Sequence, residues 1–318
     1  MTHSKILRHS ESVAAAIVAT FFATAAASSN NAPAAQTTAP SVTFAQFVDD
    51  NGASARVDQA GKLRMLSQRV TATACYVRAG VDTASTLPAL IGATDEFEAI
   101  LNALQNGDPE RGIFGAEERR RTQVGLQKLH DDYWVAFAEQ ARLISAGAGD
   151  ATNVAAMATQ SQPLLEFAMR MVSEISGQYS DPTILLQADA MVIDIAGRQR
   201  MLSQRISKNA CLLGTGLGTE ATMAELAATV SVFDTSLHAL YHGMTDAGVK
   251  PPPTEEIADA LGKVVERWNA LQPVLASVSW DGSVDSDVMA MVYTETTALT
   301  GEMNTIVGLY AEASKLGI

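Results

Sequence analysis

A repeated segment constrains the fold of this chain more than any other feature of its sequence. Residues 60–80 read AGKLRMLSQRVTATACYVRAG, and residues 196–216 read AGRQRMLSQRISKNACLLGTG. The same offset pairs further residues outside the repeat, namely Asp58 with Asp194 and Phe97 with Phe233. Trp134 and Trp268 fall two residues out of step with that offset. A shared offset over this length indicates that one domain is duplicated within the chain.

Each copy is predicted to fold into four helices, judged from the spacing of apolar residues and from breaks at Gly, Pro and Asp. The expected helices cover residues 44–79, 84–106, 115–147 and 151–179 in the first copy, and 182–214, 219–246, 254–279 and 285–316 in the second. Strand signals are nearly absent. We therefore predict an all-α protein of two tandem up-down four-helix bundles, over residues 44–180 and 181–318.

The N-terminal residues have the pattern of an export signal. Lys5 and Arg8 precede an apolar run from Val13 to about Ala27, and small residues follow. This order predicts a secretory signal peptide over residues 1–27, with a flexible leader over residues 28–43. The apolar run is shorter than the roughly 20 residues that a membrane span needs, and no later uncharged run reaches that length. We therefore expect a periplasmic protein that does not span the membrane after processing.

The net charge limits the kind of partner. The chain carries a formal charge of −13, which becomes −14 without Lys5, Arg8 and Glu11 of the predicted signal peptide. Because the chain is so acidic, its overall electrostatic field is not expected to attract nucleic acid. If it binds an anion, it must do so with a few local arginines.

The repeated helix has two different faces. At 100° per residue, one stripe is apolar and suits the core of its own bundle: Leu63, Leu66, Val70, Ala74 and Val77. The face around Arg64 is small and weakly polar: Val57, Ala60, Gly61, Gln68, Thr71 and Cys75. The second copy repeats this face around Arg200: Ile193, Ala196, Gly197, Gln204, Ser207 and Cys211. Small residues let another helix approach closely, so this face is predicted to be a second interface.

Joining the two small-residue faces predicts a pseudo-twofold dimer within one chain, with Arg64 and Arg200 near its axis. Two guanidinium groups in a partly desolvated interface repel each other and lose hydration, at a cost of several kcal/mol. A small planar oxyanion between them converts this repulsion into charge-assisted hydrogen bonds. The alternative is that an acid or a carbonyl neutralises each arginine internally.

The string RMLSQR, preceded by AG, resembles the signature of the PilJ/NarX-like sensor domain of pilus-linked chemoreceptors and nitrate/nitrite sensor kinases. The resemblance is sharp over about twenty residues of each copy. It implies a periplasmic four-helix bundle in which the first arginine of the motif, one from each subunit of a dimer, holds nitrate or nitrite. The candidate ligand-binding residues are Arg64, Arg200, Gly61, Gly197, Ala60, Ala196, Gln68 and Gln204.

Two departures from that family bear on function. The family usually continues into a membrane helix and a signalling module, whereas this sequence stops at Ile318. We therefore expect it to report to a membrane-bound receptor, kinase or transporter in signalling or chemotaxis. Gln59 and Ile195 differ just before the AG pair, so the ligand could differ from nitrate. The alternatives are a helical adaptor that binds no ligand, and a homodimer formed through other faces.

Cys75 and Cys211 each follow their motif arginine by eleven residues, about three helical turns, so each shares a face with it. In an oxidising compartment this placement permits a disulfide across the pseudo-twofold axis. The alternative is a pair of reduced, buried thiols.

Other candidate chemistry is weak, and we predict no enzyme, no cofactor and no metal. His238 and His242 are four residues apart, with Asp234 one turn earlier, but solvated histidines are favoured over a metal site. No serine or cysteine is paired with a histidine base in the sequence pattern, so no catalytic residue is assigned. Several methionines at helical spacing are interpreted as core residues rather than copper ligands: Met65, Met169, Met171, Met201 and Met303.

Overall fold

The computed structural model describes residues 44–179, 187–278 and 284–317. Within these ranges the regular structure is helical, with two isolated β-bridges between loop residues. The predicted signal peptide and leader lie outside the described residues. None of the described helices is both long enough and apolar enough to cross a membrane.

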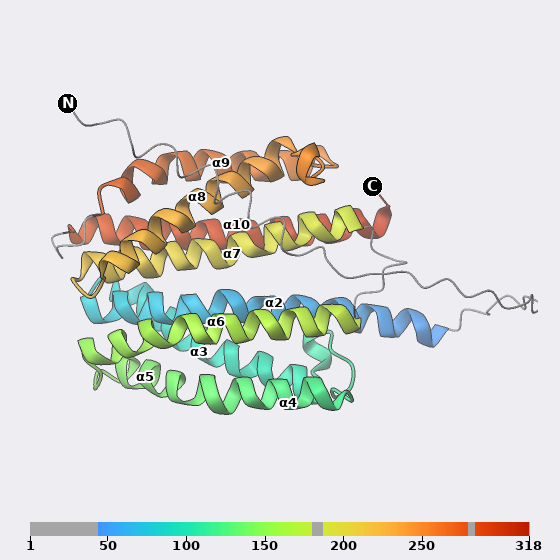
Figure 1. Ribbon diagram of the computed structural model, residues 1–318, viewed down its shortest axis with the longest axis horizontal. Coiled ribbons are helices and arrows are strands. Elements are labelled where there is room, and N and C mark those ends of the chain that lie inside the picture. The colour runs from blue at the N-terminus through green and yellow to red at the C-terminus, as the bar shows by residue number, and fades with distance from the viewer. Residues whose placement is uncertain (1–43, 180–186, 279–283, 318) are drawn as a thin grey trace, which may run out of the picture. The chain divides into compact units, whose positions relative to one another are not determined.

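Each copy of the repeat folds into an up-down bundle, drawn from blue to green for the first copy and from yellow to red for the second (Figure 1). The first bundle contains α2 (Phe44–Ala79), α3 (Thr83–Asn106), α4 (Arg120–Lys128), α5 (Val135–Ser145) and α6 (Ala151–Tyr179). A π-helical turn over Leu129–Trp134 joins α4 and α5 into one third helix. The second bundle contains α7 (Gln187–Gly214), α8 (Glu220–His242), α9 (Glu255–Ala276) and α10 (Ser286–Leu316). The predicted all-α fold is confirmed.

The second helix of each bundle ends at a glycine that its turn requires. Gly107 and Gly243 have φ of 81° and 79°, which side chains rarely adopt. A Cβ atom at Gly107 would lie 2.6 Å from the carbonyl oxygen of Gly115, too close for any other residue. The predicted helix over 219–246 is therefore wrong at its end, because the chain leaves α8 after His242 and forms a 3₁₀ turn instead.

The third helix of the first bundle begins at Arg120 rather than at the predicted residue 115. The backbone N–H of Glu117 donates to the carbonyl oxygen of Gln105 at 2.9 Å, which ties this segment to the end of α3. Gly115 also has a positive φ of 85°. The segment is therefore a connection held in an extended path, although its composition is compatible with a helix.

The π-helical turn explains why the two tryptophans are out of step. The offset between the copies is 136 residues at Phe97, 135 at the first residues of α4 and α9, and 134 at Trp134. One extra residue lies before α4 and another in the π-helical turn, which widens the helix locally. Trp134 consequently stacks on Phe97 with ring centroids 3.9 Å apart, just as Trp268 packs on Phe233 at 4.3 Å.

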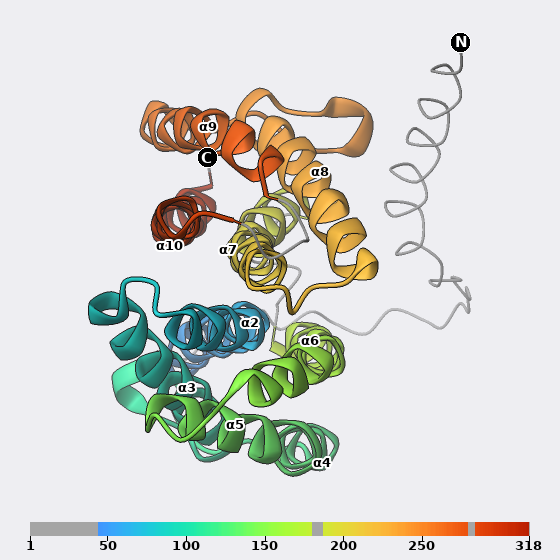
Figure 2. The ribbon, with the colours of Figure 1, turned by 90° about the vertical axis from the view of Figure 1, so that its left-hand side faces the viewer.

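The first and last helices of each bundle form the contact between the bundles, α2 and α6 against α7 and α10 (Figure 2). The ring of Tyr76 on α2 lies 5.1 Å from the ring of Tyr293 on α10. The Tyr76 hydroxyl donates to the carbonyl oxygen of Ser207 on α7 at 3.2 Å. Leu165 of α6 packs in the hydrophobic core of the second bundle. The predicted pseudo-dimer within one chain is therefore present.

Candidate functional site: a pair of buried arginines

Helices α2 and α7 run side by side in the same direction, so that equivalent residues of the repeat meet. Cys75 and Cys211 are joined with their Cα atoms 6.1 Å apart. Three turns earlier on each helix, Arg64 and Arg200 lie close to one another. The cysteines and the arginines are two pairs of equivalent residues, and the members of each pair lie close together about three turns apart along the helices. The helices are therefore parallel and in register.

The two guanidinium groups lie over the two motif glycines. A Cβ atom at Gly61 would be 3.7 Å from Nη2 of Arg64 and 3.8 Å from Nη2 of Arg200. At Gly197 the corresponding distances are 3.6 Å to Arg200 and 3.8 Å to Arg64. The structure therefore brings the two like charges together, as the repeat predicted. The bare glycine backbones leave space beside both groups.

Each arginine is paired with an aspartate from the other copy. Nη1 of Arg64 lies 3.2 Å from Oδ1 of Asp194, and Nη1 of Arg200 lies 3.5 Å from Oδ1 of Asp58. The arginines are 7% and 3% exposed, whereas the aspartate side chains are 41% and 39% exposed. The carboxylates therefore lie at the rim of the site and the guanidinium groups lie inside it.

The rim aspartates also hold a second cation each. Lys62 lies 3.1 Å from Asp58, and Arg198 lies 2.7 Å from Asp194, both one turn along the same helix. Four cations thus share two carboxylates at this site, which leaves two positive charges without a matching negative charge. These six side chains together therefore carry an excess of positive charge.

Burial is the main cause that lowers the pKa of Arg64, because the charged form loses its hydration. Asp194 opposes this effect, whereas the like charges of Arg198 and Arg200 add to it. At Arg64 the effect of burial on the pKa therefore outweighs the opposing effect of Asp194. A bound anion would favour the charged form through direct hydrogen bonds.

Comparisons with known proteins assign the chain to a family. Residues 49–162 and 186–286, about two thirds of the chain, match the PilJ family, described as "Type IV pili methyl-accepting chemotaxis transducer N-term". The chain belongs to the PilJ family. The methyl-accepting chemotaxis protein McpN of Pseudomonas aeruginosa is 34% identical to it over 118 residues. That match covers 37% of this chain and 21% of McpN, so the chain aligns with about a fifth of its relative's length.

Each of the two matched PilJ segments contains one RMLSQR motif. The first matched segment contains Arg64, and the second contains Arg200. Two PilJ copies in one chain therefore supply both halves of the arginine pair.

The remaining predicted residues of the PilJ motif face their own bundles. Ala60 and Ala196 are fully buried in the first and second hydrophobic cores. Nε2 of Gln68 donates to the carbonyl oxygen of Ser161 on α6 at 3.3 Å. The structure thus places these residues behind the arginines, where they position α2 and α7.

The equivalent glutamine of the second PilJ copy has the same role. Nε2 of Gln204 donates to Oγ1 of Thr300 on α10 at 2.7 Å and to the carbonyl oxygen of Thr296 at 3.4 Å. Both glutamines therefore fasten a motif helix to the last helix of its bundle.

Asn304 contacts the arginine pair, and the sequence analysis did not identify it. Its Oδ1 accepts a hydrogen bond from Nη1 of Arg200 at 2.7 Å. Asn304 lies on α10, more than a hundred residues along the chain from the motif. It belongs to no repeated string, so the comparison of the two copies contained no signal for it.

The structure contains a disulfide between Cys75 and Cys211, which links the two PilJ copies. Both cysteines are almost fully buried. The bond joins α2 and α7, the helices that carry Arg64 and Arg200. It therefore covalently holds the two halves of the site in register.

The histidine pair has no metal-site geometry. The rings of His238 and His242 lie 4.4 Å apart, but the nearby Asp234 accepts hydrogen bonds from Trp268 and Gln272. No group of three or more metal-ligating side chains occurs in residues 44–179, 187–278 and 284–317.

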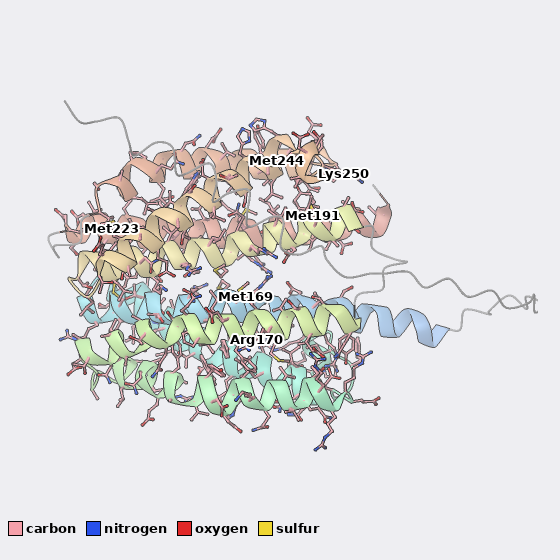
Figure 3. All side chains as sticks on the ribbon, viewed as in Figure 1. Met169, Arg170, Met191, Met223, Met244 and Lys250 are labelled. Carbon is pink, nitrogen blue, oxygen red and sulfur yellow. A yellow bond between two sulfur atoms is a disulfide. The ribbon has the colours of Figure 1, made fainter. Side chains whose placement is uncertain are left out.

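The methionines labelled in Figure 3 do not converge on one site. Met171, Met201 and Met303 are buried as predicted, but Met169 is 37% exposed, so its assignment to the core is wrong. Figure 3 shows Met169, Met191, Met223 and Met244 well separated along the molecule. This separation does not suit a shared soft-metal site.

Proposed function

We propose that this protein is a periplasmic sensor that binds a small planar oxyanion, nitrate or nitrite, between Arg64 and Arg200. It acts without catalysis and reports occupancy to a membrane-bound receptor, kinase or transporter. The observation that carries the proposal is the pair of buried guanidinium groups, each within 4 Å of the Cβ positions of both motif glycines.

The site carries positive charge that its two aspartates do not fully balance. Two buried like charges destabilise the contact between the bundles, and the exposed aspartates at the rim screen them only in part. A planar anion accepts hydrogen bonds from two guanidinium forks at once, which suits the geometry of arginine better than that of lysine. Binding would therefore stabilise the approach of α2 and α7.

The comparisons support a role in chemotaxis signalling. The family is described by its place in a chemotaxis transducer, and the relative in Pseudomonas aeruginosa is named as a methyl-accepting chemotaxis protein. The signalling partner proposed here is accordingly a membrane protein of that pathway.

The second candidate function is a helical adaptor that binds no anion. It is favoured by Asp58 and Asp194, which pair with the arginines across the interface. The two functions differ in one measurable property, because only the sensor gains affinity for free anions from Arg64 and Arg200.

Isothermal titration calorimetry tests the proposal. We expect the purified protein to bind nitrate or nitrite in preference to sulfate and chloride. Arg64→Ala and Arg200→Ala are each expected to weaken binding roughly a hundredfold, because each removes charge-assisted hydrogen bonds worth about 1.5–3 kcal/mol apiece. The double variant is expected to show no binding.

The matched control is Arg142→Ala, which removes an exposed arginine that pairs with Glu98 away from the site. It should bind as the wild type does. The double variant should stay folded, because Asp58 and Asp194 keep Lys62 and Arg198 as partners. Equal binding by the wild type and the double variant, or no binding of any oxyanion by the wild type, would refute the sensor and favour the adaptor.

A second prediction concerns the motif glycines. Gly61→Ala combined with Gly197→Ala is expected to weaken nitrate binding at least tenfold, about 1.4 kcal/mol, because the new methyl groups occupy the space beside both guanidinium groups. The same variant is expected to be more stable by about 0.5–1 kcal/mol per substitution, since alanine favours a helix and each Cβ meets only ordinary contacts. Calorimetry should therefore show a lower nitrate affinity, while urea denaturation should show a higher free energy of unfolding. A parallel loss of stability and affinity would show that the glycines serve packing alone.

A further inference from the structure

The two halves of the arginine site have unequal surroundings. Gln68 donates to the carbonyl oxygen of Ser161 on α6, and Gln204 donates to that of Thr296 on α10. Ser161 and Thr296 are therefore equivalent positions of the two copies. With this offset of 135 residues, Asn304 on α10 is equivalent to Met169 on α6. Both positions are exposed, and each follows a buried residue, Ala168 or Met303. The position equivalent to Asn304 of the second bundle thus carries a thioether instead of an amide in the first bundle.

Arg200 is held firmly before any anion arrives. Asn304 accepts from its Nη1 at 2.7 Å, and the carbonyl oxygen of Gly197 accepts from its Nε at 3.4 Å. Oδ1 of Asp58 also lies 3.5 Å from the same Nη1. Two separate elements, α7 and α10, thus fix the plane of this guanidinium group.

Arg64 is held by fewer contacts. Its Nη1 donates to Asp194 at 3.2 Å. Its Nε is buried and has no hydrogen-bond partner among the described residues. A buried donor without a partner is costly, so an acceptor that enters the site gains more from Arg64 than from Arg200. Met169 at the equivalent of Asn304 cannot offer the oxygen that would meet this need.

We infer that the two arginines have different roles. Asn304 is a positioning residue that fixes Arg200 before the anion binds, and Arg64 is the arginine whose missing hydrogen bond the anion supplies. This inference rests on the proposed function. It implies that the two copies of the repeat supply one fixed arginine, Arg200, and one responding arginine, Arg64. The signal of occupancy then originates at Arg64 on α2, in the first bundle.

Two substitutions at one exposed position test the role of Asn304. Asn304→Met reproduces the first copy, and we expect it to weaken nitrate binding about tenfold because Arg200 is no longer preset. Asn304→Asp keeps the size of the side chain but places a carboxylate on Arg200, and we expect at least a hundredfold loss because this carboxylate competes with the anion. Thr305→Val is the control, since Thr305 is the exposed neighbour on α10 and its hydroxyl donates to the carbonyl oxygen of Gly301 within that helix.

A spectroscopic readout separates positioning from general destabilisation. The Nε–Hε signals of the arginines are assigned with Arg64→Lys and Arg200→Lys, and their ¹⁵N relaxation is measured without anion. We expect Arg200 to be more rigid than Arg64, and Asn304→Met to remove that difference while the melting temperature stays the same. On adding nitrate, the signal of Arg64 should shift and become rigid.

The outcomes distinguish the two levels of the proposal. If the wild type binds nitrate but Asn304→Met binds equally well, or if both arginines are equally rigid without anion, the unequal roles are refuted and the sensor stands. If the wild type binds no nitrate and the Arg64 signal does not move, the sensor and the responding role of Arg64 are refuted together.

Discussion

Removal of the disulfide between Cys75 and Cys211 is expected to lower the free energy of unfolding by about 2–5 kcal/mol. The bond closes a loop with a sequence separation of 136 residues, and long loops lose the most entropy on closure. It also connects the two bundles, so its loss enlarges the set of conformations open to the unfolded chain. The double variant Cys75→Ala with Cys211→Ala avoids placing a polar group at either buried position.

Urea denaturation measures this effect directly. The wild type with reductant and the double variant without it should both unfold at lower urea than the oxidised wild type. The double variant is its own control, because reductant should leave its midpoint unchanged. Nitrate affinity should fall as well, since α2 and α7 are then held only by noncovalent contacts. An unchanged midpoint after complete reduction would show that packing of the bundles alone sets the stability.

The second large effect is expected at Arg56, where Arg56→Met should cost about 3–5 kcal/mol of stability. Arg56 is 4% exposed and lies 3.9 Å from Glu117, which is itself 2% exposed. Its Nη1 donates to the carbonyl oxygen of Leu104 at 2.9 Å, and its Nη2 donates to that of Gly115. Loss of the cation leaves Glu117 buried without its charged partner and leaves both carbonyl oxygens without their donor.

Thermal or urea denaturation of three variants isolates the cause. Arg142→Met removes an exposed arginine paired with Glu98 and should cost less than about 1 kcal/mol. Combining Arg56→Met with Glu117→Gln should recover part of the stability, because the uncompensated carboxylate is gone. The second bundle has Val192 at the equivalent of Arg56 and packs it in its core. A cost for Arg56→Met no larger than that for Arg142→Met would contradict a buried role for this pair.

The exposed aspartates distinguish the candidate site from an ordinary buried ion pair. Asp58 and Asp194 have partners on their own helices as well as across the interface. An incoming anion can therefore replace them at Arg64 and Arg200 without leaving either carboxylate unpaired. The same contacts also suit an adaptor, and calorimetry of the double arginine variant distinguishes the two functions.

The sequence by itself determined the duplication and the class of fold, and it predicted that Arg64 lies near Arg200. The first two follow from local rules, because helical periodicity assigns each residue to a face, whereas the pairing of the two repeated faces was a prediction that the structure bears out. Most helix ends were also readable, since glycine and proline act on the backbone next to them.

Only the tertiary structure decided how each charge is compensated. The contacts of Asn304 with Arg200, of Arg56 with Glu117 and of the two glutamines with the last helices join residues far apart in the chain. Periodicity states which face a residue occupies but not which residue of a distant helix lies opposite. The π-helical turn of the first bundle was hidden for the same reason, because the packing of Trp134 on Phe97 requires it and no local pattern does.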